Sequence, residues 1–249
     1  MATILEVAVD SLASARAAIA GGADRLELCG SLAVGGLTPY AELLKQVREE
    51  SDINIRCLMR PRGGDFLYTK EEIQMMAAQI ENLRKLGADG FVIGCLTADG
   101  ELDSKAMEPL LKAAHGTGLT LHRCIDVSRD PCKTYLDAKE LGIDTILTSG
   151  AAGNSLLGMD TIGKLLQLRD IHHGPEVLIG GGVNAKTITT FRTAFPHAVA
   201  FHLSGKTDIE SGMRFRREGV PMGIPGLDEW HIQQTDETNI RNARVAIDA

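Results

Sequence analysis

Short apolar runs and longer amphipathic segments alternate along almost the whole chain. Apolar runs bounded by glycine or polar residues are typical of strands that are buried on both faces. They predict strands at 3–9, 24–29, 53–59, 90–94, 119–123, 145–148, 177–180 and 198–203. Apolar residues at helical spacing predict helices at 11–20, 38–50, 69–86, 103–114, 131–141, 155–170, 185–194 and 235–247. Each predicted strand is therefore followed along the chain by a predicted helix.

This alternation predicts parallel strands joined by crossover helices. Eight such units in 249 residues fit a closed barrel better than an open sheet. The predicted fold class is therefore α/β, a (β/α)8 TIM barrel, and we expect residues 1–249 to form a single domain because no linker interrupts the pattern. Residues 205–230 lack a regular pattern, which predicts an irregular loop that caps one barrel end or makes an oligomer contact. The final helix follows at 235–247.

The overall charge narrows the class of partner. A net charge of −7 and a pI of about 5.5 disfavour non-specific binding to nucleic acid or to anionic membranes. No apolar run reaches the roughly 18 residues of a membrane-spanning helix, and the first residues do not form a basic leader sequence. We therefore expect a cytoplasmic protein without a membrane or nucleic-acid partner. The five cysteines lack CxxC spacing, which indicates reduced thiols.

The loop at 59–68 is the most distinctive stretch of the sequence. Arg60 and Arg62 flank Pro61, and two glycines precede Asp65. An arginine at the end of a buried strand needs a partner, because an unpaired buried charge is costly. One interpretation is a structural clamp in which Asp65 pairs with an arginine and shapes the loop. The other is a site for a carboxylate or phosphate ligand, formed by Arg60, Arg62 and Asp65.

Several acid–base side chains lie at or near the predicted strand ends. These candidate catalytic residues are Glu6, Glu27, His122, Asp126 and His202. A single histidine in a strand is ordinarily a hydrogen-bonded core group. However, the carboxyl ends of parallel barrel strands meet at one face, where barrel enzymes have their active sites. We therefore expect these side chains to form one site.

The same strand ends carry residues suited to bind an anion. The candidates are Arg123, Thr148, Ser149, Gly181, Gly182, Ser204 and Gly205. The loops after strands seven and eight of such barrels commonly hold a phosphate on backbone N–H groups, although glycine also occurs there only to form turns. No lysine in the sixth strand could form a Schiff base, and no Walker loop indicates a nucleotide cofactor.

Motifs along about the first 205 residues resemble those of the CutC family. They are Gly-Ala-Asp-Arg-Leu-Glu-Leu-Cys at 22–29, Gly-Gly-Leu-Thr-Pro at 35–39, Arg-Pro-Arg-Gly-Gly-Asp-Phe at 60–66, His-Arg at 122–123 with Asp126, and Leu-Thr-Ser-Gly at 147–150. The resemblance implies a cytoplasmic TIM-type barrel, a homodimer or higher homo-oligomer, and a role in copper homeostasis. Many bacterial relatives carry a cysteine shortly after the first-strand glutamate, whereas here Val7, Ala8 and Val9 follow Glu6.

Two functional hypotheses follow. The first is a copper(I)-binding protein: copper(I) prefers thiolate ligands, and Cys29 and Cys124, with His122 or His202, could supply them at the barrel end. The second is an enzyme that acts on a small anionic or phosphorylated metabolite by acid–base chemistry. There the arginines would hold the anionic group, and Glu27 or His122 would transfer protons. The expected ligand is thus a copper ion or a small anion.

Overall fold

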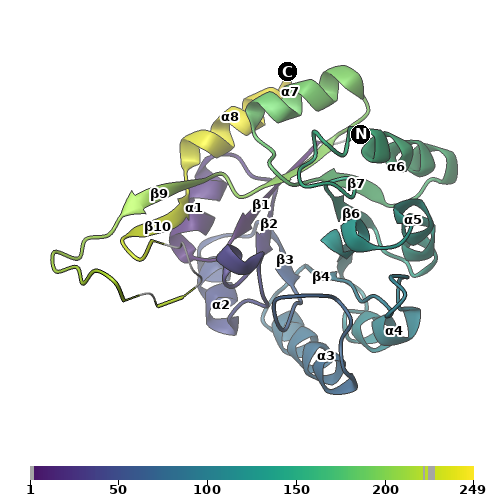
Figure 1. The fold of residues 1–249 in the computed structure, drawn as a ribbon, viewed down its shortest axis with the longest axis horizontal. Coiled ribbons are helices and arrows are strands. Elements are labelled where there is room, and N and C mark those ends of the chain that lie inside the picture. The colour runs from purple at the N-terminus through teal and green to yellow at the C-terminus, as the bar shows by residue number, and fades with distance from the viewer. Residues whose placement is uncertain (1–2, 221, 224–227) are drawn as a thin grey trace.

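The computed structural model describes residues 3–220, 222–223 and 228–249 and shows a closed barrel of eight parallel strands in the order β1 to β8. The strands are β1 (Ile4–Val9), β2 (Arg25–Leu28), β3 (Asn54–Leu58), β4 (Gly90–Ile93), β5 (Gly118–Leu121), β6 (Thr145–Thr148), β7 (Glu176–Ile179) and β8 (Ala200–Leu203). The helices are α1 (Leu12–Ala20), α2 (Ala41–Glu50), α3 (Lys70–Lys85), α4 (Ser104–Ala113), α5 (Pro131–Glu140), α6 (Met159–His172), α7 (Ala185–Ala194) and α8 (Glu237–Asp248). They surround the strands (Figure 1). The predicted (β/α)8 barrel is confirmed.

Local sequence signals explain where the helices begin. The Thr69 hydroxyl accepts a hydrogen bond from the Glu72 amide and the Glu72 side chain accepts one from the Thr69 amide, which forms a capping box at the start of α3. Asp130 caps α5, whose first residue is Pro131. Helix α6 begins at Met159, later than the predicted start at 155, because residues 149–158 form a loop that is hydrogen-bonded to neighbouring strand ends.

Side chains alternate between two environments along each strand. One set packs outward against the helices in the main apolar core, and Cys57 belongs to this set, whereas the adjacent Leu58 faces inward. The inward set forms two small apolar clusters inside the barrel. The first consists of Cys29, Leu58 and Val92, and the second of Leu147, Leu178 and Ala200. Charged residues from β1, β2 and β3 are also buried in the barrel.

The predicted end of the fifth strand needs correction. Strand β5 ends at Leu121, so His122 and Arg123 do not lie in it. His122 is instead the N-cap of a 3-10 helix, η2 (Arg123–Val127). A second short 3-10 helix, η1 (Leu32–Val34), follows β2.

The segment 205–230 is not irregular throughout. Strand β9 (Lys206–Glu210) pairs in antiparallel register with β10 (His231–Thr235), which occupies the predicted first residue of the last helix. The β9–β10 hairpin projects from the side of the barrel next to α1 and does not close a barrel end (Figure 1). The predicted loop also includes residues 221 and 224–227, which lie outside the described residues.

Candidate functional site

A cavity of about 550 Å³ opens at the end of the barrel where the parallel strands finish. Nine of the predicted site residues line it: Glu27, Arg60, His122, Arg123, Asp126, Gly181, Gly182, His202 and Ser204. They come from the ends of five strands (β2, β3, β5, β7 and β8) or from the loops that follow them, so the closed barrel brings together residues that are up to 177 positions apart (27 to 204). The structure therefore places these nine strand-end residues together at one face of the barrel.

Glu6 and His202 form a hydrogen-bonded pair at the floor of the cavity, in which Glu6 is buried and His202 is half-buried and lines the cavity. They are aligned in register on adjacent strands, and the His202 Nδ1–H donates to Glu6 Oε1 over 2.8 Å. The other oxygen of Glu6 accepts from the Arg25 guanidinium. Burial opposes ionisation of Glu6, but Arg25 and His202 outweigh it and lower its pKa to about 2. Glu6 is therefore an ionised, fully paired carboxylate.

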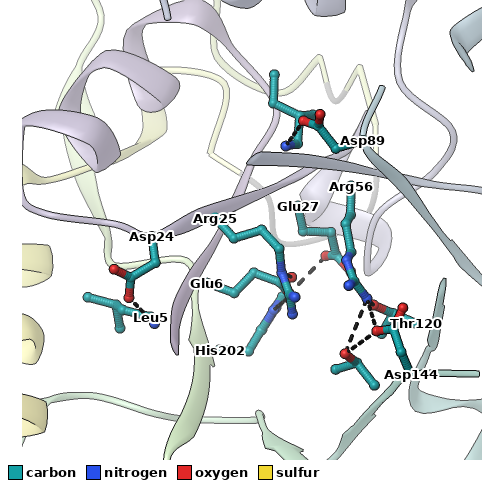
Figure 2. Close-up of polar contacts among 12 residues, drawn as sticks. Leu5, Glu6, Asp24, Arg25, Glu27, Arg56, Asp89, Thr120, Asp144 and His202 are labelled. Carbon is teal, nitrogen blue, oxygen red and sulfur yellow. Dashed lines mark hydrogen bonds and ion pairs between the residues drawn. The ribbon is translucent and has the colours of Figure 1, made fainter. Parts of the chain in front are cut away.

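Glu27 lies on the other side of the His202 ring. Its Oε2 is 3.8 Å from His202 Nε2 and 3.3 Å from the Cys29 sulfur, which donates its proton to it. Burial raises the pKa of Glu27. Burial alone would lower the pKa of His202, but Glu27 and Glu6 together raise it. Figure 2 shows His202 between the two carboxylates, with Arg25 beside Glu6.

Two charged residues inside the barrel escaped the sequence analysis. Arg25 neutralises Glu6, and Arg56 donates from Nη1 to Thr120 Oγ1 at 2.6 Å and to Asp144 Oδ1 at 2.7 Å (Figure 2). Both arginines occupy inward positions of strands that the sequence pattern predicts. Arg25 shares a face of β2 with Glu27, and Arg56 shares a face of β3 with Leu58. That parity was the available signal, because a charged residue inside a buried strand requires a partner.

The two arginines of the 59–68 loop have different roles. Arg62 is paired with Asp65 at 3.0 Å and with Glu72 at 2.7 Å, and neither Arg62 nor Asp65 lines the cavity. Arg60 lines the cavity and donates to the carbonyl oxygens of Val34, Gly36 and Gly64. Within the described residues no carboxylate pairs with Arg60. The structural clamp therefore belongs to Arg62, and the charge available to a ligand belongs to Arg60.

His122 sits beside this arginine in an apolar setting. Its ring centroid is 4.7 Å from that of Phe66, over which Arg60 also lies. Burial, with a contribution from Arg60, lowers the pKa of His122 to about 3. Nδ1 accepts from the Cys124 amide, so Nε2 carries the proton, and Nε2 has no partner in the described part of the chain. His122 is therefore neutral, and its Nε2–H group is shielded from solvent.

Asp126 serves the loop after β6. Its two oxygens accept from the Thr148 hydroxyl at 2.5 Å, the Ser149 amide at 2.9 Å, the Ala151 amide at 3.0 Å and Arg123 Nε at 2.7 Å. These donors surround a carboxylate that is only 5% exposed, so the acceptor sites of Asp126 are occupied. We therefore assign Asp126, Thr148 and Ser149 to loop positioning. Thr148 and Ser149 do not line the cavity.

The residues of the two glycine-rich loops also divide into those that line the cavity and one that does not. Gly181 and Gly182 line the cavity with positive φ angles of 89° and 73°, a conformation that favours glycine. Ser204 also lines it. Gly205 does not, because it lies against Ile240, where a Cβ atom would be 2.4 Å from Ile240 Cδ1. The Lys206 ammonium at the rim donates to Gln233 Oε1 at 2.9 Å.

The two candidate copper ligands lie in different parts of the core. Cys29 packs inside the barrel, and Cys124 belongs to the main core between strands and helices. Both are fully buried, and burial raises the pKa of each thiol well above its usual value. Cys124 is close to His122, because a Cβ atom on Gly94 would lie 2.5 Å from Cys124 Sγ and 2.6 Å from His122 Cε1.

The sequence and the fold were compared with those of known proteins. Residues 3–207 match the model of the CutC family. A CutC family protein of Bacteroides thetaiotaomicron is 41% identical over 97% of both chains. The human copper homeostasis protein cutC homolog is 36% identical over 96% of this chain and 86% of its own. The solved structure of CutC from Streptococcus agalactiae is 28% identical, with a TM-score of 0.75 over 81% of this chain and 98% of that chain. None of the helices in the described ranges is long and apolar enough to cross a membrane.

Proposed function

This chain belongs to the CutC family, and from that premise we propose that it acts in copper homeostasis in the cytoplasm. The human relative, which shares 36% identity over 96% of the chain, is named for that role. The single observation that carries the proposal is the match to the family over residues 3–207, which includes every strand of the barrel. The cavity at the strand ends is the place where a ligand would bind.

Copper would be the cargo. Copper(I) prefers thiolate ligands, and imidazole also binds copper. Cys124 and the neutral ring of His122 flank Gly94, so they offer a sulfur and a nitrogen in one place. Cys29 lies next to Glu27, which lines the cavity. Since the pKa of each thiol is raised, copper(I) must displace a proton from each sulfur that it binds.

The test is an anaerobic titration of the reduced protein with copper(I) against a competing chelator. We expect one ion per chain with the native protein and loss of that binding in the Cys29→Ser/Cys124→Ser double variant. Cys57→Ser is the matched control, because Cys57 is also fully buried but faces the helices. Binding that survives the double variant, or that exceeds one ion per chain, would refute this copper(I) site.

A second candidate function is catalysis on a small anionic or phosphorylated metabolite. The observation that favours it is Arg60, which lines the cavity while its described partners are carbonyl oxygens only. A guanidinium without a carboxylate can bind an anionic group in two-point contact. Glu27 and His202 face each other across 3.8 Å in the same cavity and could exchange protons with the ligand.

This candidate is tested by thermal unfolding of the protein with inorganic phosphate and with small carboxylates. We expect the melting temperature to rise with ligand concentration for the native protein and not for Arg60→Met. The control Arg129→Met alters an arginine that pairs with Asp99 and does not line the cavity. Equal stabilisation of native protein and Arg60→Met would exclude Arg60 as the anion ligand.

We also propose that the protein forms a homodimer or higher homo-oligomer through the β9–β10 hairpin. The hairpin exposes Ile209 and Ile232, which are directly paired, and the following segment exposes Met213 and Phe215. A two-stranded sheet is marginally stable in water by itself. Covering these apolar side chains with a second copy would stabilise it.

A further inference from the structure

Three side chains around the floor of the cavity form a compact donor group. Glu6, Glu27 and His202 each present a ligand atom, and these atoms lie within 4.8 Å of one another. They come from β1, β2 and β8, which are neighbours in the barrel, so the closure of the sheet creates the group. Figure 2 shows the three side chains converging. One histidine nitrogen and two carboxylates are a more specific arrangement than a cluster of acids.

The hydrogen bonds assign a role to each member. Glu6 is occupied on both sides, by Arg25 on Oε2 and by the His202 Nδ1–H on Oε1. This bond fixes the His202 ring so that Nε2 lies 3.8 Å from Glu27 Oε2. A histidine ligand commonly donates its second N–H to a carboxylate in this way, which orients the ring and strengthens the ligand. We propose that His202 Nε2 and Glu27 bind a divalent transition-metal ion at the floor of the cavity, with Glu6 as the positioning residue.

The distances agree with a shared ion. Zinc binds histidine nitrogen and carboxylate oxygen at about 2.0–2.2 Å, so two such donors on one ion lie roughly 3–4 Å apart. His202 and Glu27 both line the cavity, so the remaining coordination positions face its interior. Water or an anionic ligand from the cavity would fill them. The charge of Arg25 is matched by Glu6, and the charge of Arg56 by Asp144, which leaves Glu27 as the carboxylate that faces the ion.

The donor chemistry also selects the class of ion. Nitrogen and oxygen ligands suit Zn²⁺, Ni²⁺ and Cu²⁺, whereas copper(I) prefers sulfur. Cys29 Sγ is 3.3 Å from Glu27 Oε2 but does not belong to the three-membered group. This inference goes beyond both candidate functions, since it requires neither a thiolate ligand nor a substrate.

Isothermal titration with Zn²⁺ tests the proposal on the full chain. We expect one Zn²⁺ per chain, and an affinity at least about tenfold lower for Glu27→Gln and for His202→Asn. Glu6→Gln should weaken binding by about 10- to 100-fold, as expected for a group that orients a ligand. With Co²⁺ as a probe, Glu6→Gln should also change the visible absorption spectrum of the bound ion. A merely structural role for Glu6 would leave that spectrum unchanged.

Two controls isolate the site. His231→Asn removes an exposed histidine that is hydrogen-bonded to Asp228 at 2.6 Å, and it should leave Zn²⁺ binding unchanged. Cys124→Ser, which removes a candidate copper(I) ligand that packs outside the barrel interior, should also retain Zn²⁺ binding, so failure of the copper(I) site and failure of this site give different results. Melting temperatures without metal confirm that each variant is folded. Native affinity in both Glu27→Gln and His202→Asn, or absence of Zn²⁺ binding to the native protein, would overturn the proposal.

Discussion

The two histidines of the candidate site show how neighbours set the chemistry of a residue. His202 lies between the carboxylates of Glu6 and Glu27, which raise its pKa. His122 lies in an apolar setting near Arg60, which lowers its pKa to about 3. The sequence presented both as equivalent acid–base candidates. Of the two histidines, His202 is the one with a ring nitrogen that faces a carboxylate of the cavity, so the acid–base chemistry of the second candidate function rests on His202 and Glu27 and not on His122.

The neutral state of His122 predicts a pH dependence of stability. Its pKa is lower in the folded chain than the ordinary value of about 6.5 in the unfolded chain, so the unfolded chain binds the extra proton as the pH falls. Its contribution to stability is therefore complete above about pH 6.5 and declines toward pH 3. We expect a loss of about 2 kcal/mol between about pH 7 and pH 5 from this residue.

The measurement is urea unfolding of native protein and His122→Asn at both pH values. Asparagine can still accept from the Cys124 amide as an N-cap, but it does not titrate. The free energy of unfolding should fall less with pH in the variant. An unchanged difference between the two pH values would contradict a buried neutral His122.

At the scale of elements, one carboxylate connects a helix to the neighbouring loop. Asp126 belongs to η2, and its oxygens hold the first residues after β6, including Ser149 and Ala151. Ser149 in turn accepts from Arg123 at 2.6 Å, which places Arg123 at the cavity. The loop therefore obtains its shape from η2, and for this reason α6 begins later than the sequence pattern suggested.

Asp126→Asn should destabilise the protein by about 2–4 kcal/mol, because the amide nitrogen must face donors that now lack an acceptor. Asp130→Asn is the matched control: it changes an aspartate four positions away that caps α5, and asparagine is an equally good N-cap. Urea unfolding of both variants measures the difference. A loss below about 0.5 kcal/mol for Asp126→Asn would show that the loop does not depend on this carboxylate.

At the scale of the whole molecule, the family model matches all strands of the barrel but only the first residues of the β9–β10 hairpin. The match to the family model ends at residue 207, near the start of β9, whereas α8 lies beyond that point and still completes the ring of helices. The hairpin between them packs near α1 and otherwise exposes its side chains. Apart from Lys206 at the cavity rim, this exposed, partly apolar extension lies away from the cavity and is the surface through which the proposed homo-oligomer would form.

If the proposed homo-oligomer forms through the hairpin, replacement of both paired isoleucines, Ile209→Lys with Ile232→Lys, should convert it into monomers. The like charges would face each other across the antiparallel pair and across any interface that the hairpin forms. Light scattering after size-exclusion chromatography measures the mass of each species. Val245→Lys is the control, because it alters an apolar residue on α8 that is even more exposed than the two isoleucines. A native protein that is already monomeric would refute the proposed oligomer.

The sequence by itself determined the eight strand–helix units, because the spacing of apolar residues depends only on whether a segment is helical or extended. It also determined which face each strand residue uses, so that Cys57 packs outward while Glu27 and Arg60 reach the cavity. These properties are local. They can be identified one element at a time.

Only the tertiary structure decided which groups are partners. Glu6 meets Arg25 and His202 because β1 is aligned in register with β2 and β8. Asp65 and Glu72 both pair with Arg62, and Arg60 therefore stays available to a ligand. Strand β9 pairs with β10 across a connection of 20 residues (211–230). Charge states, ion pairs and strand pairing depend on distances between residues that are far apart in the sequence, and the closure of the barrel sets those distances.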